Sequence, residues 1–363
     1  MKAEKLGGSS HLIEMPAALN EPDEKPYLNA CPPLSSGTRG FILMDFSNVG
    51  RIDGLGASMM VKLNALARRR RQVTIAFGMN DQHRAVFDLT GLDHAMQVCR
   101  DRVEAFSVAG LPFPATPGLS TPAAADDFTG WARPVARLTV PPLPSQAINL
   151  NMAGRRVVGP VDGFGPLWQK TYRLPVKGTS LSPQDIIAVL KRDFPRLQPG
   201  YNRFYPTGRG IAPGEVVAID SSTPGGPVST GVMVLYADDV SFTFITPQGH
   251  PESGWVTFTA FRSGGNLITQ ILGLARANDP LYELAFRTVG SKMQIKIWTH
   301  VLESLAKQLG VPGDVSVEAV CVDPGVKWSQ SGNLWYNAQI RTMLSAPVWW
   351  IGKKISGRQR GKA

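Results

Sequence analysis

Five polar side chains in the second half of the chain are suited to acid and base chemistry. They are Tyr205, Glu215, Asp220, His250 and Arg262, and such groups can exchange protons with a ligand when they line a cavity. Their spacing matches no catalytic motif, and polar residues that satisfy hydrogen bonds in strands explain them better. The sequence therefore predicts no catalytic residue. The alternative is that the protein is an enzyme and that some of these side chains act in catalysis.

Metal and cofactor sites are not predicted. The histidines stand alone, without the spacing to another His or Cys that a metal site requires. The cysteines are equally scattered, which favours a reducing cytoplasm over a disulfide-bonded secreted chain. These residues are His11, His83, His94, His250 and His300, with Cys31, Cys99 and Cys321.

The strongest local pattern lies between residues 40 and 71. Phe41 to Met44 is an apolar run that ends at Asp45, which is typical of a buried strand. After a Gly-rich turn, apolar residues from Met59 onward recur every three or four positions, which predicts a helix with one buried stripe. Cations suit the end of a helix, so we interpret Arg68 to Arg71 as a C-terminal cap, with an acidic docking surface as the alternative.

The same order repeats further along the chain. Residues 72–78 form a short β-branched strand, and a second helix follows from about Asp81 to Thr90. A strand–helix–strand–helix order predicts a parallel sheet with right-handed crossovers.

These segments together resemble a STAS domain, the fold of anti-sigma factor antagonists. The resemblance covers residues 10–105 and rests on segments in the family's order: the strand ending in Asp45, Ile52-Asp53-Gly54-Leu55-Gly56, the Arg-rich helix end, and Val86-Phe87-Asp88-Leu89-Thr90-Gly91-Leu92. It implies a bacterial signalling protein that binds a protein partner, either an anti-sigma factor or a kinase-like regulator. The prolines between residues 16 and 33 depart from the family, because they leave little room for its first helix.

The family's partner site lies at the turn before the first long helix. Carried over by position, it comprises Asp53, Gly54, Leu55, Gly56, Ala57 and Ser58. In the family a kinase phosphorylates the serine that follows the aspartate, but Gly54 has no hydroxyl. Ser58, on the first helical turn, is the nearby substitute, and a phosphate there suits a helix N-terminus. The resemblance thus implies a partner-binding surface without the usual kinase switch.

Charge and aromatic residues gather near the C-terminus. The formal net charge is +10, and after Asp323 there are seven Lys and Arg residues but no acidic one. We expect residues 335–344 to pack on the preceding domain and residues 353–363 to form a solubilising tail. The alternative is peripheral contact with a membrane surface through Trp349, Trp350, Lys353 and Lys354, because aromatic and cationic side chains together suit such a surface. No nucleic-acid partner is expected, no secretory signal core is seen, and no apolar run approaches the roughly 18 residues that span a membrane.

Residues 106–148 are rich in Pro and Ala and are predicted to be a linker. A second domain over residues 149–312 follows. It begins with a strand at 167–174 and a helix at 183–194, continues through strands near 215–220, 231–236, 241–246, 255–261 and 267–274, and ends in a long amphipathic helix from Pro280 to Leu309. Residues 313–363 form a basic, Trp-rich extension.

This order of elements is similar to the START or SRPBCC-like helix-grip fold, in which a curved antiparallel sheet and a last helix enclose an apolar cavity. The resemblance implies binding of an apolar small molecule or lipid. The side chains predicted to line the cavity are Met233, Leu235, Val256, Phe258, Trp298, Leu302 and Leu305. A shift of one residue in the register of a strand would turn the predicted side chains of that strand to the other face of the sheet.

The prediction is a non-catalytic regulatory protein with an α/β STAS-like domain, a linker and an α+β helix-grip domain. Two alternatives are a cyclase- or hydratase-type enzyme that uses the helix-grip cavity, and a membrane-surface adaptor that uses the basic tail.

Overall fold

A computed structural model of the chain describes residues 2–7, 10–20, 40–113 and 129–345. The chain divides into two compact units. Unit 1 comprises Met1–Pro134 and Cys321–Pro324, and unit 2 comprises Val135–Val320 and Gly325–Ala363. The predicted linker over residues 106–148 stays a prediction; of its described residues, those up to 134 belong to unit 1 and the rest belong to unit 2.

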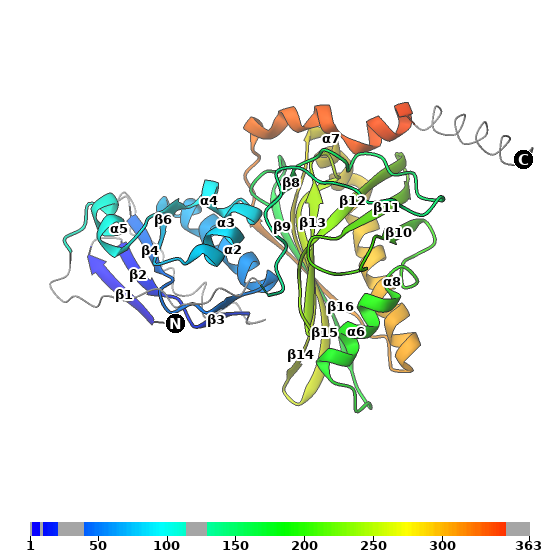
Figure 1. Cartoon of the computed structure of the whole chain (residues 1–363), viewed down its shortest axis with the longest axis horizontal. Helices are drawn as coiled ribbons and strands as arrows, with labels where there is room; N and C mark the ends of the chain where they lie inside the picture. Colours follow the sequence, from blue (N-terminus) through cyan, green and yellow to red (C-terminus); the bar gives the residue numbers. More distant parts are fainter. Residues whose placement is uncertain (1, 8–9, 21–39, 114–128, 346–363) are drawn as a thin grey trace, which may run out of the picture. The chain divides into compact units, whose positions relative to one another are not determined.

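Unit 1 contains a mixed sheet in the order β1-β2-β4-β6-β7 (Figure 1). β1 runs antiparallel to β2, whereas the pairs β2–β4, β4–β6 and β6–β7 are parallel, as the strand–helix repeat predicted. A separate parallel pair joins β3 and β5. The strands are β1 Lys2–Gly7, β2 Ser10–Glu14, β3 Ala18–Leu19, β4 Gly40–Asp45, β5 Arg51–Ile52, β6 Gln72–Phe77 and β7 Gln97–Val98.

Helices cover both faces of this sheet. Ile75 packs in one core cluster with Phe106 of α5, while the hydroxyl of the adjacent Thr74 donates to Asn64 Oδ1 of α2 at 2.8 Å. Because neighbouring residues of a strand point to opposite faces, α2 and α5 lie on opposite sides. The helices are α2 Gly54–Arg69, α3 Asp81–Thr90, α4 Leu92–Ala95 and α5 Arg102–Ala109.

Asp53 sets the start of α2. Its Oδ1 accepts the backbone N–H groups of Leu55 at 2.9 Å and Gly56 at 3.0 Å, which satisfies two donors at the helix N-terminus. At the other end Arg68 and Arg69 occupy the last turn and are exposed. The strand, the turn and the helix predicted from residues 40–71 are confirmed, but the helix is buried on most sides rather than along one stripe, since Lys62 and Asn64 are buried as well.

Unit 2 contains a large antiparallel sheet in the order β10-β11-β12-β13-β14-β15-β9-β16. β10 to β15 pair successively as a meander, and β9 then pairs with β15. The strands are β8 Val157–Val158, which pairs with β13, β9 Leu167–Val176, β10 Asn202–Pro206, β11 Val216–Thr223, β12 Gly226–Ala237, β13 Ser241–Pro247, β14 Glu252–Ser263, β15 Asn266–Ala277 and β16 Ser316–Asp323.

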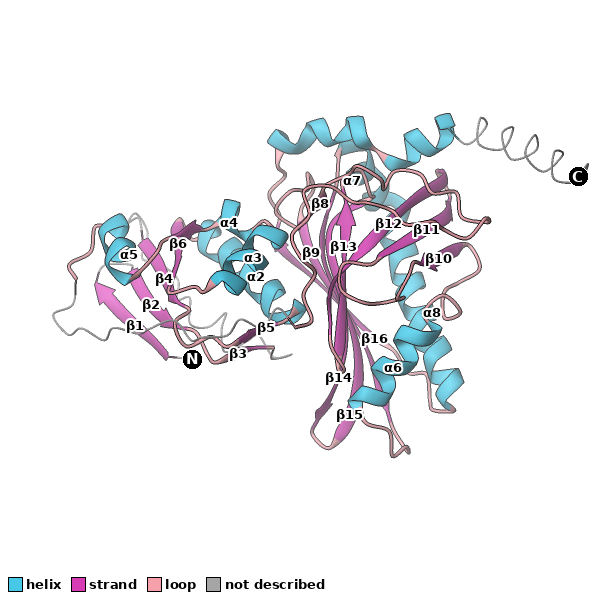
Figure 2. Cartoon of the chain, in the orientation of Figure 1, coloured by secondary structure: helices cyan, strands magenta, loops and turns pink. Residues whose placement is uncertain are grey.

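Two helices pack on one face of this sheet, α6 Pro183–Asp193 and α8 Ser291–Leu309 (Figure 2). Phe194, which directly follows α6, contacts Phe204, Phe242, Phe244 and Phe258 with ring centroids 5.2 to 5.9 Å apart. These rings, with Leu302 and Leu305 of α8, form the main core of unit 2. The antiparallel meander with a long helix across it confirms the predicted helix-grip architecture.

The predicted long helix contains an irregular turn. α7 Pro280–Ala285 leads into a π-helical turn over Phe286–Gly290 before α8 begins. Asp279 caps the start of α7 by accepting the N–H groups of Leu281 and Tyr282. The predicted limits at Pro280 and Leu309 hold, but the sequence did not reveal the widened turn between them.

Loops and the C-terminal segment pack around the sheet of unit 2. The hydroxyl of Ser253 donates to the carbonyl of Gly159 at 2.8 Å, and Arg276 Nε donates to the carbonyl of Pro160 at 3.0 Å. A 3-10 segment, Trp328–Tyr336, is followed by a helix over residues 338–345, and there Thr342 Oγ1 accepts the N–H of Ser229 at 3.0 Å. The structure therefore places residues 328–345 of the C-terminal extension on unit 2.

Candidate functional site

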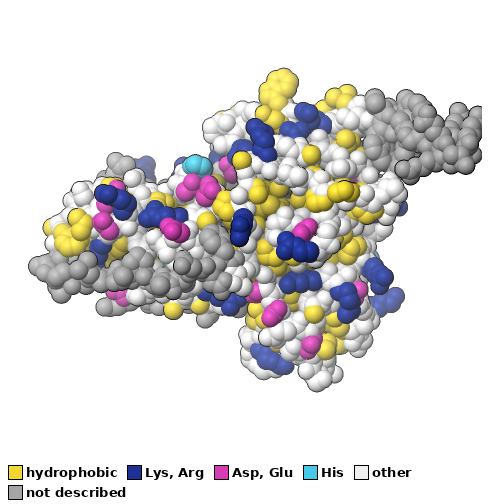
Figure 3. Space-filling model, viewed as in Figure 1, with side chains coloured by type: hydrophobic (Ala, Val, Ile, Leu, Met, Phe, Trp, Pro, Cys, Tyr) yellow, Lys and Arg dark blue, Asp and Glu magenta, His cyan; other side chains and the backbone are white. Residues whose placement is uncertain are grey.

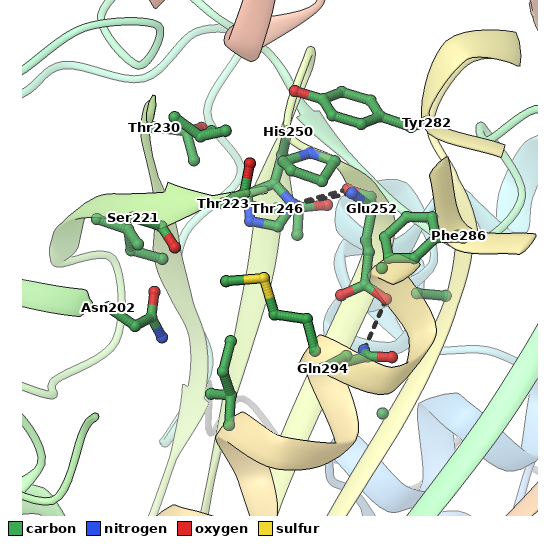
Figure 4. Close-up of a pocket in the computed structure, with 18 of the residues that line it drawn as sticks. Asn202, Ser221, Thr223, Thr230, Thr246, His250, Glu252, Tyr282, Phe286 and Gln294 are labelled. Atoms are coloured by element: carbon green, nitrogen blue, oxygen red, sulfur yellow. Dashed lines mark hydrogen bonds between the residues drawn. The ribbon is translucent and has the colours of Figure 1, made fainter. Parts of the chain in front are cut away.

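A cavity of about 270 Å³ lies in unit 2 between the sheet and the helical segment 280–309. Strands β10 to β15 supply one wall, and α7, the π turn and the first half of α8 supply the other. Its lining is mainly apolar, with a limited set of polar side chains (Figure 4). The polar residues are Asn202, Ser221, Thr223, Thr230, Thr246, His250, Glu252, Tyr282, Gln294 and Gln339.

Small residues on the sheet leave this space open. Under the second half of α8 the phenylalanine cluster fills the core, but the cavity end of β14 and β15 carries Gly254, Gly273 and Ala275. A Cβ atom at Gly273 would meet nothing closer than the carbonyl oxygen of Lys170, at 4.0 Å. The cavity therefore lies where the side chains of these strands change from large to small.

The π turn forms the opposite wall. Phe286, Val289 and Gly290 of this turn line the cavity together with Met293 of α8. A Cβ at Gly290 would lie 2.8 Å from the Phe286 ring, so glycine gives that ring room against the helix. π turns inside α-helices are frequent at functional sites.

A chain of polar contacts reaches the cavity from β9. Lys170 Nζ donates to Ser291 Oγ at 2.9 Å and to Gln294 Oε1 at 2.5 Å. Gln294 Nε2 in turn donates to Glu252 Oε1 at 2.6 Å (Figure 4). Burial raises the pKa of the Glu252 carboxyl, although the Lys170 charge and the Gln294 hydrogen bond oppose this shift. Burial likewise lowers the pKa of Lys170, and the charge of Glu252 acts against that shift.

His250 is held beside this group by the backbone of Glu252. Its Nδ1 lies 3.0 Å from the backbone nitrogen of Glu252 and 3.1 Å from the carbonyl oxygen of the same residue, and the tautomer determines whether Nδ1 accepts from the N–H or donates to the carbonyl. Burial lowers the pKa of His250 to about 4, while a hydrogen bond with the Glu252 backbone acts against this shift. The imidazole is therefore neutral at pH 7.

Two hydroxyl groups complete the polar lining. Burial raises the pKa of Tyr282, which stays protonated while its oxygen accepts the backbone N–H of Gln339 at 2.9 Å. Thr230 Oγ1 is buried and makes no hydrogen bond within the described ranges. The oxygen itself has almost no accessible surface, so it is not a contact point for a ligand in the cavity as the structure stands.

Of the seven side chains predicted to line the cavity, Val256 and Trp298 do so. Phe258, Leu302 and Leu305 belong to the filled core of unit 2 and are not among the lining residues.

Met233 and Leu235 require a correction. Val232 and Val234 of β12 face the core under the helices, so by alternation Met233 points to the other face of the sheet. Leu235 lies where the pairing with β13 shifts register, and it belongs neither to that core nor to the cavity lining. The prediction that Met233 and Leu235 face the cavity was therefore wrong.

Of the five candidates for acid and base chemistry, the structure places His250 in the cavity lining. Glu215 instead accepts from Arg209 at 2.9 Å, Asp220 accepts the N–H of Ile148, and Arg262 donates to the carbonyl of Leu181. Tyr205 is half-buried in β10 and does not line the cavity.

Sequence reasoning missed Glu252, Gln294 and Lys170. Glu252 and His250 are two residues apart at the start of a strand, which was a usable signal. The link from Lys170 to Gln294 spans 124 residues and has no sequence signature.

The predicted partner-binding residues Asp53, Gly54, Leu55, Gly56, Ala57 and Ser58 are all buried. Leu19 of β3 lies against Gly56, and the indole of Trp131 donates to the carbonyl of Ile52 at 2.8 Å. Ser58 Oγ donates to the carbonyl of Gly54 at 2.8 Å. A partner surface at these residues stays a prediction.

The predicted membrane contact through Trp349, Trp350, Lys353 and Lys354 lies outside the described residues. Before it, Trp328 and Trp335 are 73% and 82% exposed. Figure 3 shows hydrophobic side chains protruding over this C-terminal segment of unit 2. Among the helices that the structure describes, none combines the length and the apolar character needed to cross a membrane.

No three His, Cys, Asp or Glu side chains of the described ranges come together as a metal site.

The sequence matches no known protein family and no curated protein. Solved structures with partial similarity include the di-domain ARO/CYC StfQ from the steffimycin biosynthetic pathway, at 13% identity, with 40% of this chain and 53% of that chain covered and a TM-score of 0.31. Protein Ms6760 from Mycobacterium smegmatis is 14% identical over 39% of this chain and 90% of its own, with a TM-score of 0.30. Truncated norcoclaurine synthase from Thalictrum flavum is 12% identical over 40% of this chain and 95% of its own, with a TM-score of 0.31. The match thus spans about half of the StfQ chain.

Proposed function

We propose that unit 2 binds a small molecule with an apolar body and at least one polar group. The cavity itself carries this proposal. Its apolar walls favour a ligand that removes hydrocarbon surface from water. The polar side chains of the lining, among them Glu252 and Gln294, provide partners for a polar group of the ligand.

Thermal unfolding of the full chain tests this proposal, with 4-phenylbutan-1-ol as the probe. A ligand that binds the native state alone raises the melting temperature of unit 2 in proportion to its occupancy. Met293→Trp, which places a large ring in the cavity wall, should abolish this shift. Lys296→Trp is the matched control, because Lys296 is an exposed residue of the same helix that does not line the cavity.

The proposal fails if the probe leaves the wild-type melting temperature unchanged. It also fails if Met293→Trp and Lys296→Trp respond to the probe alike, since binding would then lie elsewhere.

Catalysis in the same cavity is a second candidate function, favoured by the placement of His250 beside Glu252. A neutral imidazole and a carboxyl with a raised pKa can exchange protons with a bound molecule. If unit 2 is an enzyme, protein purified from its native cells should retain different small molecules in the wild type and in His250→Asn, because the variant holds unconverted substrate. Identical retained molecules favour binding without turnover.

For unit 1 we propose a STAS-like protein-binding module, supported by its mixed α/β sheet and by Asp53 at the start of α2. Because residues 53–58 are buried, the exposed side chains of Asn48 and Arg51 on the adjacent loop are the better contact points. Capture of a partner from cell extract should be lost in Asn48→Ala/Arg51→Ala and kept in Arg69→Ala. Equal capture by both variants would remove the support for this site.

A further inference from the structure

The polar end of the cavity is acidic. Within the described ranges, Glu252 is the one Asp, Glu, Lys or Arg side chain among the cavity-lining residues. Lys170 is close in the network but does not line the cavity, and its ammonium donates to Ser291 and Gln294. A ligand in the cavity therefore meets the Glu252 carboxyl group, whereas Lys170, whose charge acts on that carboxyl, lies outside the lining.

The contacts also determine which atom of Glu252 is available. An ammonium can only donate, so Gln294 must turn its Oε1 toward Lys170 and its Nε2 toward Glu252. This orientation occupies Glu252 Oε1. In the described part of the chain Oε2 makes no hydrogen bond or ion pair, and Figure 4 shows it directed away from Gln294.

His250 does not compete for this oxygen through Nδ1. That nitrogen is held by the backbone of Glu252, 3.0 Å from its nitrogen and 3.1 Å from its carbonyl oxygen. The Lys170–Gln294–Glu252 chain thus presents one carboxyl oxygen to the ligand in a fixed orientation.

We propose that the ligand of this cavity carries a basic amine on its apolar body, and that the amine binds Glu252 Oε2. This inference rests on the proposed function of unit 2. Hydrogen bonds between an ammonium and a carboxylate are about twice as strong as neutral ones, and a low-dielectric cavity strengthens them further. A ligand carboxylate at the same position would instead meet a like charge.

The protonation of Glu252 agrees with this assignment. Burial raises its pKa in the empty cavity, and a cation beside it favours the ionised form. A neutral amine can also enter and take the proton of a protonated Glu252, which forms the same ammonium–carboxylate pair. In both cases the site then holds one ammonium and one carboxylate, and no proton is left over.

Three probes with the same apolar body test the inference on the full chain: 4-phenylbutylamine, 4-phenylbutan-1-ol and 4-phenylbutanoic acid. Isothermal titration calorimetry at pH 7 should show the amine binding about tenfold or more tighter than the alcohol, with the acid weakest. Glu252→Gln should weaken the amine by about tenfold and change the alcohol by less than about threefold, because its shape is kept.

Glu283→Gln is the matched control, since it removes the same charge from an α7 residue that pairs with Arg287 and does not line the cavity. It should keep the amine preference. Circular dichroism melts of both variants show whether each is folded, and the order of the three probes in the wild type tests the inference without any variant.

The outcomes separate the two proposals. Alcohol binding without a preference for the amine, or an amine preference that survives in folded Glu252→Gln, overturns the inference and leaves the proposed function standing. Failure of all three probes to bind overturns both.

Discussion

Thr230 illustrates how a single buried side chain can lower stability. Its hydroxyl is buried without a partner in the described residues, whereas Thr243 on the neighbouring strand bonds to Thr257 at 2.9 Å. We expect Thr230→Val to raise the free energy of unfolding of the ligand-free protein by about 1 kcal/mol, because an unsatisfied hydroxyl is removed. Thr243→Val should lower it by a similar amount, because Thr257 loses its partner.

Urea unfolding of the two variants measures this difference. If both substitutions destabilise unit 2 equally, the Thr230 hydroxyl is satisfied in the native protein.

His250 gives a pH dependence whose sign follows from its lowered pKa. In the folded state the ring stays neutral down to a pKa of about 4, whereas in the unfolded chain it takes up a proton near its ordinary value of about 6.5. The contribution of His250 to stability is therefore fully present above pH 6.5 and is lost progressively as the pH falls toward 4.

Glu252 acts in the opposite direction over part of this range, because its folded pKa is raised. The comparison of wild type with His250→Asn isolates the histidine. Between pH 6.5 and 4 the melting temperature of the wild type should fall more steeply than that of the variant, and parallel curves would show that His250 titrates normally.

At the scale of elements, the close approach of β3 to α2 depends on Gly56. A Cβ there would lie 2.1 Å from the carbonyl oxygen of Leu19 and 2.8 Å from its Cβ, so the backbone must shift. Gly50 is the control, since its Cβ would lie 3.6 Å from the nearest atom, an ordinary contact. We expect Gly56→Ala to destabilise unit 1 by about 1–3 kcal/mol despite the higher helix propensity of alanine.

Chemical unfolding followed by circular dichroism measures both variants. Gly50→Ala should stay close to wild type. A Gly56→Ala variant as stable as Gly50→Ala would mean that β3 does not lie against α2 in solution.

The order of elements was predictable because each has a local signal. Alternating apolar residues marked β14, the Ser182-Pro183 pair marked the start of α6, and Asp279-Pro280 marked the start of α7. β1 was missed because Lys2–Gly7 alternates weakly and is stabilised mainly by pairing with β2. The exposed strand β16 was missed because Ser316–Asp323 has no buried apolar face to give it a pattern.

The site was less predictable than the fold. Val256 and Trp298 line the cavity, but Phe258 of the same strand and Leu302 of the same helix lie in the filled core, because an apolar face alone does not show where the core ends and the cavity begins. The π turn and the Lys170–Gln294–Glu252 chain depend on contacts between residues far apart in the sequence. No local pattern of residue types encodes such contacts.

At the scale of the whole molecule, the cavity and its polar chain lie entirely within unit 2. Binding there should stabilise unit 2 by mass action whatever unit 1 contacts. Ligand binding is therefore proposed for unit 2 alone. Protein binding by unit 1 is a separate proposal, and it is tested separately.

The central claim is that the cavity of unit 2 holds a small molecule with an apolar body. Native mass spectrometry of the full chain, purified from the cells that produce it, tests this claim most directly. The wild type and Lys296→Trp should each show a mass above that of the bare chain, which is lost on denaturation, whereas Met293→Trp should show the bare chain alone. A wild-type protein without a retained small molecule, or a Met293→Trp variant that retains it to the same extent, would contradict the account.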